Sequence, residues 1–305
     1  MVVFDKDTSF AFMLAAVELG HRVYHCKPID LFQRGREVFA NARAADLGPA
    51  RLELGEREEL DLSELDAVLV RKDPPFDIQY LHLTQQLDLV KSRTLVVNDP
   101  AGLRTANEKL FTFQFADFMP RSMVSAEPER IRAFLDEVGG RAVLKPLDGA
   151  GGSGVVALAV GDTNTRALID LLTREGREAA LVQEYVADVR TGDKRVLLLD
   201  GKPLGAILRV PRADDFRANI HVGGQVEPTE LTHAELSLIG AVAPALRQHG
   251  LWFVGLDLIG ERLIEVNVTS PTGIQELSRF EGTKHEVRVI TWICERATEL
   301  GSVPG

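Results

Sequence analysis

A glycine-rich stretch between two apolar runs constrains the fold of this chain more than any other feature. Four glycines fall within residues 149–154, after the apolar run 141–146 and before the apolar run 155–160. Without a Cβ, glycine lets the backbone lie against phosphate oxygens. Both flanking runs have the composition of strands. The stretch therefore predicts a strand, a mobile loop and a second strand that close over a triphosphate, as in kinases.

The same residues argue against the common phosphate-binding motifs. Gly149, Gly151 and Gly154 have the spacing of a dinucleotide fingerprint, but that motif needs a helix after the loop, and a β-like run follows here. No GxxxxGK[ST] motif occurs, and the kinase motifs HRD and DFG are absent. A plain flexible hairpin is the alternative. Nucleotide binding is favoured because Lys145, a lone ammonium in an apolar strand, needs an anion.

A second motif sets polar side chains into two apolar runs around Gly260. Glu265 and Asn267 are two residues apart, so they share one face of a strand. A three-residue turn at 260–262 would place Asp257 opposite Glu265 on that face, whereas a two-residue turn would place it on the other face. Carboxylate and amide oxygens suit Mg²⁺. We expect a magnesium site rather than a solvent-exposed carboxylate pair.

Other residues suggest how an acidic substrate could be bound. Arg195, Arg209 and Arg217 can each bind a carboxylate or phosphate through two parallel hydrogen bonds, although each alone could be a surface charge. The polar segment 212–224 predicts either an active-site lid or an ordinary loop. No GxSxG or HExxH motif is present, so metal- and phosphate-assisted chemistry is favoured over a side-chain nucleophile.

Composition narrows the class of protein. The 305 residues allow two domains, and 35 Lys and Arg against 45 Asp and Glu give a net charge of −10, which disfavours nucleic acid and anionic membrane as partners. The two cysteines, Cys26 and Cys294, are too far apart for a zinc motif and too few for a disulfide framework. With no signal-like or membrane-spanning run, we expect a cytoplasmic protein.

The order of patterns predicts an α/β fold class that becomes α+β toward the C-terminus. Residues 1–106 alternate β-like and helical patterns, beginning with a short strand at 2–4, and form an N-terminal α/β domain. Residues 107–305 begin with a helix near 109–118 and form a second domain. It comprises a subdomain with the glycine-rich loop at about 120–186 and a mostly antiparallel subdomain at about 187–305.

Six strings spread over nearly the whole chain together resemble bacterial glutathione synthetase, a member of the ATP-grasp superfamily. The resemblance implies a pre-ATP-grasp domain and then two subdomains that clamp ATP. It also implies the synthesis of glutathione, ADP and phosphate from γ-glutamylcysteine, glycine and ATP through an acyl phosphate. Mg²⁺, or Mn²⁺ in its place, and a homodimer or homotetramer are further implications. The strings are RKDPPFD (71–77), NEKLF (107–111), LKPLDG (144–149), GDKRV (192–196), VGLDLIG (254–260) and EVNVTSPT (265–272).

The resemblance implies a role for each matching residue. Arg195 and Arg209 would be the catalytic pair near the transferring phosphate and the peptide carboxylate, and Asp257, Glu265 and Asn267 match the magnesium ligands. The residues expected to bind substrate are Arg217, Asn219, Ser270, Pro271 and Thr272. The residues expected to bind ATP are Lys109, Lys145, Asp148, Gly149, Gly151, Gly152, Ser153, Gly154, Gln183, Glu184, Tyr185, Val186 and Asp193.

The sequence departs from the family pattern at two places, and three other functions remain as alternatives. The stretch before Lys6–Phe10 is shorter than in the family, or the chain is trimmed, and residues 216–224 differ from the commoner RGNLAAGG sequence. A different ATP-grasp ligase, such as a D-alanine ligase or an amino-acid-adding enzyme, would accept other acids. A phosphotransferase would release a stable phosphorylated product. A regulator that only binds nucleotide would show no turnover.

Overall fold

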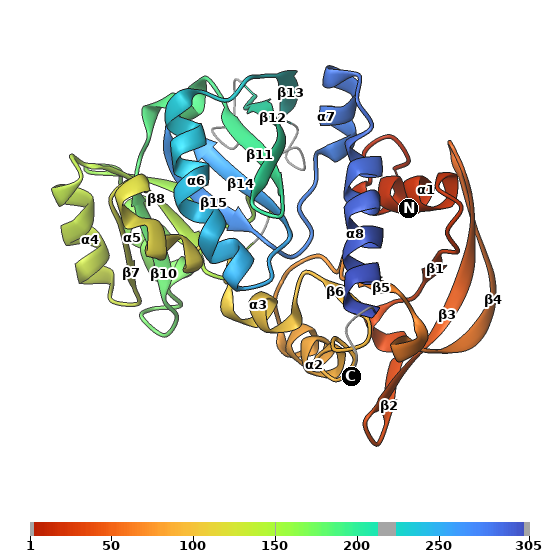
Figure 1. Ribbon diagram of the computed structural model, residues 1–305. Helices are drawn as coiled ribbons and strands as arrows, with labels where there is room; N and C mark the ends of the chain where they lie inside the picture. The colour runs from red at the N-terminus through yellow and green to blue at the C-terminus, as the bar shows by residue number, and fades with distance from the viewer. Residues whose placement is uncertain (1–2, 150, 213–223, 302–305) are drawn as a thin grey trace.

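Three sheet-containing parts lie side by side in the computed structural model, which describes residues 3–149, 151–212 and 224–301 (Figure 1). The N-terminal part carries a long antiparallel hairpin, β3–β4, in a four-stranded sheet, and a separate parallel pair, β5–β6. Its elements are α1 (Thr8–Glu18), β1 (Tyr24–His25), η1 (Pro28–Asp30), β2 (Leu31–Arg34), β3 (Glu37–Gly48), β4 (Arg51–Asp61), η2 (Leu62–Glu64), β5 (Ala67–Leu69), α2 (Ile78–Leu87), β6 (Leu95–Val97) and α3 (Pro100–Thr105).

The strand predicted at 2–4 is wrong for the residues that the structure describes there. Val3 and Phe4 lie outside any strand, and the backbone N–H groups of Lys6 and Asp7 both donate to the carbonyl of Val3. This turn leads directly into α1, whose first turn is capped by the Asp7 carboxylate accepting from the N–H of Phe10. The chain therefore begins with a capped helix.

The second part is a four-stranded antiparallel sheet in the order β7-β10-β8-β9. The glycine-rich loop joins β8 to β9, as the sequence predicts. Apolar residues of α4 and α5, including Ile131, Phe134 and Ile169, pack with Leu144 and Val182 of the sheet. The elements are η3 (Phe111–Phe118), β7 (Ser122–Ser125), α4 (Pro128–Glu137), β8 (Arg141–Pro146), β9 (Val156–Ala159), α5 (Thr165–Leu172) and β10 (Ala180–Glu184). The helix predicted near 109–118 is instead the 3₁₀ segment η3, broken at Phe115 (φ −120°, ψ 39°).

The third part is a five-stranded antiparallel sheet in the order β13-β12-β11-β14-β15. Alternate residues of β11 face its two sides: Val196 and Leu198 belong to the core that includes α6, and Leu197 and Leu199 to the core that includes α7 and α8. A two-residue turn at Asp200 and Gly201 joins β11 to β12. The elements are η4 (Ala187–Arg190), β11 (Asp193–Leu199), β12 (Lys202–Val210), β13 (Gln225–Pro228), α6 (His233–Gln248), β14 (Phe253–Ile259), β15 (Arg262–Asn267), α7 (Ile274–Glu281) and α8 (His285–Gly301).

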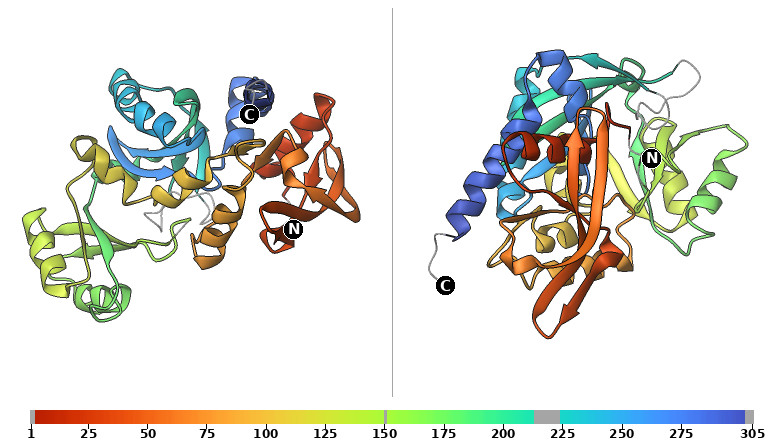
Figure 2. Two further views of the ribbon diagram at one scale, coloured as in Figure 1. Left: turned by 60° about the horizontal axis from the view of Figure 1, so that its bottom comes forward. Right: turned by 90° about the vertical axis from the view of Figure 1, so that its right-hand side faces the viewer.

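The N-terminal part is fastened to the five-stranded sheet by helix α8 and by one asparagine. Helix α8 packs against α1, β5 and β6, and the views in Figure 2 show it beside the N-terminal part. Asn98 is buried, and its side-chain amide donates to the carbonyls of Phe253 and Val268 and accepts from the N–H groups of Trp252 and Phe253. None of the helices in the described part of the chain is long and apolar enough to cross a membrane.

Candidate active site

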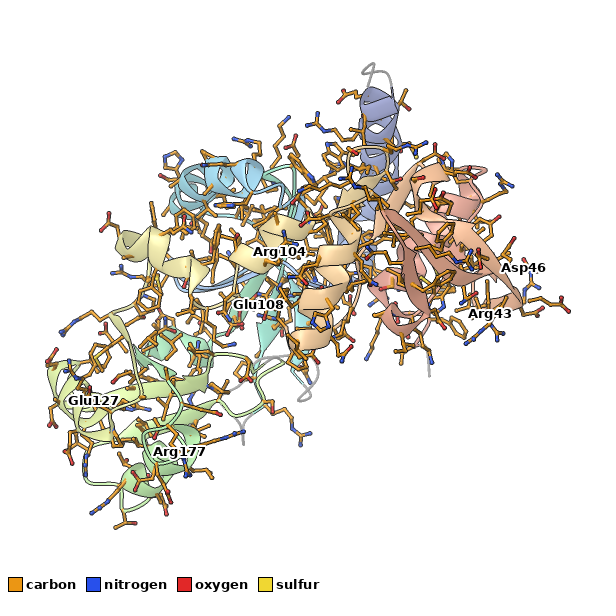
Figure 3. All side chains as sticks on the ribbon, turned by 90° about the horizontal axis from the view of Figure 1, so that it is seen from below. Arg43, Asp46, Arg104, Glu108, Glu127 and Arg177 are labelled. Carbon is orange, nitrogen blue, oxygen red and sulfur yellow. The ribbon has the colours of Figure 1, made fainter. Side chains whose placement is uncertain are left out.

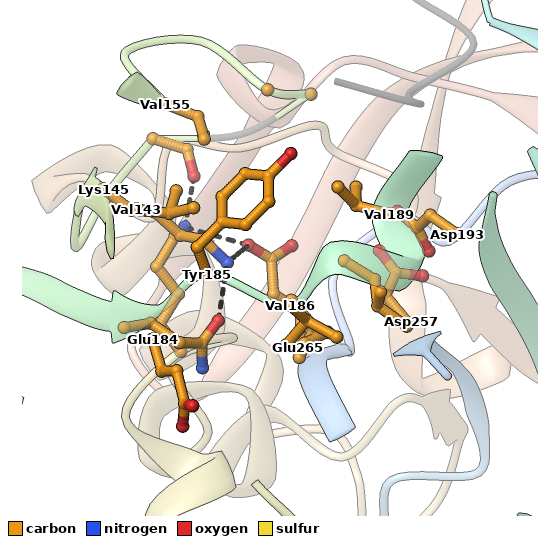
Figure 4. A pocket seen from close by; sticks show the side chains of 17 residues that line it. Val143, Lys145, Val155, Glu184, Tyr185, Val186, Val189, Asp193, Asp257 and Glu265 are labelled. Atoms are coloured by element: carbon orange, nitrogen blue, oxygen red, sulfur yellow. Dashed lines mark hydrogen bonds and ion pairs between the residues drawn. The ribbon is translucent and has the colours of Figure 1, made fainter. Parts of the chain in front are cut away.

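A cleft lies between the sheet β7-β10-β8-β9 and the five-stranded sheet. Many residues expected to bind ATP line it: Lys109, Lys145, Gly149, Gly151, Gly152, Gln183, Glu184, Tyr185, Val186 and Asp193. Asp148, Ser153 and Gly154, by contrast, are exposed and do not line it. Figure 4 shows Lys145 and Glu265 on facing sides of the cleft, with Asp193 and Asp257 close together beyond them. Ten of the thirteen residues expected to bind ATP therefore lie around one cleft, and their role in binding ATP stays a prediction.

Two buried lysines converge on Glu265. Lys145 projects from β8, and its Nζ lies 3.2 Å from Gln183 Oε1 and 4.0 Å from Glu265 Oε1. Lys109 donates to the carbonyl of Gly149 at 2.5 Å, and its Nζ lies 3.9 Å from the same Glu265 oxygen. Burial lowers the pKa of Lys145, which shows that its ammonium is poorly compensated. An anionic group in the cleft would supply the missing charge.

The glycines of the loop have two different roles. A Cβ on Gly149 would lie 2.6 Å from Pro146 Cγ and 2.9 Å from the carbonyl oxygen of Ser153, so the loop's own shape requires glycine there. Gly151 (φ 62°) and Gly152 (φ 81°) adopt left-handed conformations and line the cleft. Only this second pair fits the expectation of a backbone that approaches a ligand.

The register of β14 and β15 corrects one expectation and confirms another. Ile259 pairs with Arg262, so the turn has two residues, and the predicted three-residue turn is wrong. A bulge between Asp257 and Leu258 shifts the register, and Asp257 pairs with Glu265 as expected. The bulge does what the longer turn would have done, because one extra residue on one strand moves the following side chains to the other face.

Asp257 is held in a buried network with both predicted catalytic arginines. Arg195 donates through Nε at 2.5 Å and through Nη2 at 2.9 Å, and Arg209 Nη2 lies 2.9 Å from the Asp257 carboxylate. Arg209 also donates to Asp193 at 2.6 Å. Burial alone would raise the pKa of Asp257, but the two arginines hold it well below its usual value. Burial raises the pKa of Asp193 to about 6 despite Arg209.

The predicted metal ligands are brought together, but they are not equally available. Both Asp257 oxygens already accept from arginines, whereas the ion-pair partners of Glu265 among the described residues are the two lysines near 4 Å. Within the same described ranges, the buried Nδ2 of Asn267 has no hydrogen-bond partner. Across the described residues, no group of three or more His, Cys, Asp or Glu side chains forms a metal cage. Glu265 and Asn267 fit a hard cation that takes further oxygens from a ligand.

A second cavity continues from the first and shares Gly151 and Glu265 with it. The predicted substrate residues Ser270, Pro271 and Thr272 line it, as do Arg195 and Arg209. The predicted substrate residues Arg217 and Asn219 lie outside the described residues, as does nearly all of the expected lid.

Sequence reasoning missed the residues that build the wall of the second cavity. The half-buried Arg71 supports this wall from behind, since it donates to the carbonyl of Pro271 at 2.9 Å, and desolvation lowers its pKa to about 10. Asp73 accepts from the hydroxyl of Ser270 at 2.5 Å, and Glu108 accepts from Thr269 at 2.9 Å. Burial, with Glu265 nearby, raises the pKa of Glu108 to about 7. The sequence signal for Arg71, Asp73 and Glu108 is the charge within the strings RKDPPFD (71–77) and NEKLF (107–111).

Comparison with known proteins agrees with this geometry. Residues 1–104 match the prokaryotic glutathione synthetase N-terminal domain, and residues 108–282 match the ATP-grasp domain of the same family. The chain is 45% identical over 279 residues to glutathione synthetase of Mesorhizobium japonicum, covering 90% of this chain and 89% of that protein. It is 43% identical over 300 residues to glutathione synthetase of Synechocystis, covering 94% and 93%.

Solved structures support the fold alone. A RimK-domain ATP-grasp protein from Sphaerobacter thermophilus has a TM-score of 0.60 at 18% identity, covering 96% of each chain. A D-cycloserine synthetase has a TM-score of 0.59 at 18% identity, covering 78% of this chain and 86% of the other. With both domains matched and the identity above 40% over most of its length, the chain belongs to the prokaryotic glutathione synthetase family.

Proposed function

We propose that this chain is an ATP-dependent ligase that joins γ-glutamylcysteine to glycine and releases ADP and phosphate. The observation that carries the proposal is the position of Glu265 between two cavities. On one side lie the buried ammonium groups of Lys109 and Lys145 at 3.9 and 4.0 Å, and the other cavity is lined by Arg195 and Arg209. A nucleotide and an acid can thus meet at one point.

In this proposal, ATP occupies the first cleft. Lys109, Lys145 and the backbone of Gly151 and Gly152 bind its phosphates, because both ammonium groups are buried and both glycines line the cleft. Gln183–Val186 would lie along the adenine, with Asp193 further along the cleft. The hydrogen bond from Gln183 Nε2 to Ser122 Oγ supports this by orienting the oxygen of Gln183 toward Lys145.

Glu265 and Asn267 would hold Mg²⁺, or Mn²⁺ in its place, and Asp257 could join them only if an arginine turned away from it. The ion would supply positive charge to the phosphates during transfer. The donor set supports this assignment, because among the described residues the Glu265 carboxylate has no closer ion-pair partner than the two lysines, and carboxylate and amide oxygens are the ligands that Mg²⁺ prefers.

The remaining chemistry belongs to the chain's own side chains. Arg195 and Arg209 would orient the cysteinyl carboxylate and offset its charge, so that its oxygen attacks the γ-phosphorus and ADP leaves. Once the ammonium of glycine has lost a proton to solvent, its amine attacks the carbonyl carbon of the acyl phosphate, the new C–N bond forms as the C–O bond to phosphate breaks, and the departing phosphate takes the second proton. Segment 212–224 as a lid that excludes water, with substrate contacts from Arg217 and Asn219, stays a prediction.

We also propose a cytoplasmic homodimer or homotetramer, with a domain boundary near residue 106. The two free cysteines, Cys26 and Cys294, suit a reducing compartment and support the location. The assembly rests on the family resemblance alone, and light scattering of the purified protein measures it. A monomeric mass at all concentrations would reject it.

The release of ADP with γ-glutamylcysteine, measured with and without glycine, tests the proposed reaction. We expect steady turnover only with glycine, and ADP, phosphate and glutathione in equal amounts. A stable phosphorylated product would identify a phosphotransferase, and nucleotide binding without turnover would identify a regulator. Turnover with other acids but not with γ-glutamylcysteine would identify a different ATP-grasp ligase.

A further inference from the structure

The second cavity contains a carboxylate that the proposed reaction has not yet used. Glu108 lines this cavity, and one of its oxygens accepts a hydrogen bond from Thr269 at 2.9 Å. In the described part of the chain, no Lys, Arg or His nitrogen lies within ion-pair distance of it. Figure 3 shows Glu108 near the middle of the molecule, where the three parts meet.

The neighbouring cations are directed elsewhere. The ammonium of Lys109 donates to Gly149 and faces Glu265, although Lys109 follows Glu108 in the sequence. The guanidinium of Arg195, which lines the same cavity, is bound to Asp257. Burial and the nearby Glu265 carboxylate raise the pKa of Glu108, and the more distant charges of Lys109 and Arg195 offset only part of this. The structure therefore presents a half-buried carboxylate that lacks a cation.

A backbone hydrogen bond places Glu108, and so any cation bound to it, at one end of the second cavity. The carbonyl of Glu108 accepts from the N–H of Val266 at 3.0 Å, so Glu108 lies beside the strand that carries Glu265 and Asn267. This is the end of the cavity that adjoins the first cleft, because Glu265 lines both. Asp73, the other carboxylate apart from Glu265 that lines this cavity, is exposed and already accepts from Ser270.

On the proposed function, two substrate groups carry an ammonium: glycine and the glutamyl end of γ-glutamylcysteine. The glutamyl ammonium is at the far end of the dipeptide from the carboxylate that reacts. The nitrogen of glycine must instead come directly to that carboxyl carbon, beside the phosphate. We infer that Glu108 binds the ammonium group of the incoming glycine and thereby selects an amino acid as the acceptor. The inference rests on the proposed function and assigns one further specificity-determining residue to it.

Glu108→Gln is the decisive variant, because its amide oxygen can still accept the hydrogen bond from Thr269 while the charge is lost. A charge-assisted hydrogen bond is worth enough that we expect KM for glycine to rise at least about tenfold. KM for ATP and for γ-glutamylcysteine should stay near the wild-type values. Glu108→Asp, which keeps the charge on a shorter side chain, should recover part of the loss. The matched control is Glu127→Gln, at an exposed, remote glutamate, and should behave as wild type.

Trapping of the acyl phosphate by hydroxylamine separates recognition of glycine from activation of the acid. Hydroxylamine is largely uncharged at neutral pH and needs no ammonium site. In the absence of glycine, Glu108→Gln should therefore form the hydroxamate at the wild-type rate. Equal losses with glycine and with hydroxylamine would overturn the inference, because they would indicate general damage to the site.

Three further results would overturn the inference, and two of them would assign Glu108 another role. An unchanged KM for glycine would show that Glu108 binds no ammonium during turnover. A raised KM for γ-glutamylcysteine alone would assign Glu108 to the glutamyl ammonium. A changed Mg²⁺ requirement alone would make it a metal ligand. If the wild-type protein forms no glutathione, the proposed function fails, whereas active wild type with an unaffected variant rejects only the role of Glu108.

Discussion

Replacing Asp257 with asparagine tests the buried ion-pair network in depth. Asp257 is 2% exposed and accepts from Arg195 and Arg209, both of which are also buried. In the variant, an amide N–H group would face guanidinium N–H groups, and the arginines would keep only Asp193 as a buried anion. Removing one partner of a buried ion pair costs about 3–5 kcal/mol. We expect the melting temperature to fall by on the order of 10 °C, together with nearly all turnover.

Glu265→Gln provides the matched comparison on the paired residue of the next strand. Its carboxylate is 3.9–4.0 Å from its nearest cations and its side chain is 18% exposed, so we expect less than about 1 kcal/mol of lost stability. Turnover should nevertheless be lost, because a proposed metal ligand is removed. Thermal denaturation of both variants, followed by circular dichroism, distinguishes the two cases. Equal stability of Asp257→Asn and wild type would refute the reasoning from the network.

Three other predictions follow from the loop, the domain contact and the titration of the second cavity. Gly149→Ala should weaken ATP binding in titration calorimetry more than it lowers thermal stability, because the new Cβ would force the loop away from Pro146. Unchanged affinity would show that the loop does not contribute to ATP binding. Asn98→Ala should destabilise the protein by several kcal/mol in urea unfolding, since four buried hydrogen bonds are lost, and a wild-type unfolding midpoint would contradict this. The raised pKa of Glu108, about 7 against an ordinary 4.5, means that the folded state binds this proton more tightly than the unfolded state, so wild-type stability falls as pH rises between these values. Without ligands, Glu108→Gln should therefore be more stable than wild type at about pH 8, by up to about 3 kcal/mol, and equal to it at about pH 4; a constant difference would exclude this titration.

The sequence predicted those parts of the site that depend on residues close together in the chain, such as short apolar runs and the alternation of side chains along a strand. The strands on either side of the glycine-rich loop follow from short apolar runs, and Lys145 stands out because it interrupts one of them. Strand periodicity places Glu265 and Asn267 on one face of β15, but the facing of Asp257 and Glu265 depends on a bulge. The bulge that produces this facing could not be read from the sequence, because apolar residues occupy both faces of these strands and leave no alternation to count.

The parts that the sequence did not predict depend on contacts between distant residues. Arg195 meets Asp257 because β11 pairs with β14 in register, and no spacing within either string encodes that pairing. Likewise, Asp73 and Ser270 meet only because the N-terminal part packs against the end of β15. Helix α8 was not predicted, and it is the element that joins the last residues described to α1 and β6.

Transfer of isotopic oxygen tests ATP-dependent ligation through an acyl phosphate most directly. γ-Glutamylcysteine labelled with heavy oxygen in its cysteinyl carboxylate is incubated with the enzyme, ATP, Mg²⁺ and glycine, and the inorganic phosphate is examined by mass spectrometry. A carboxylate oxygen that attacks the γ-phosphorus leaves with the phosphate when the amine displaces it. We therefore predict one labelled phosphate for every glutathione formed. Glutathione accompanied by unlabelled phosphate would contradict the acyl phosphate, and labelled phosphate without glutathione would contradict the ligase.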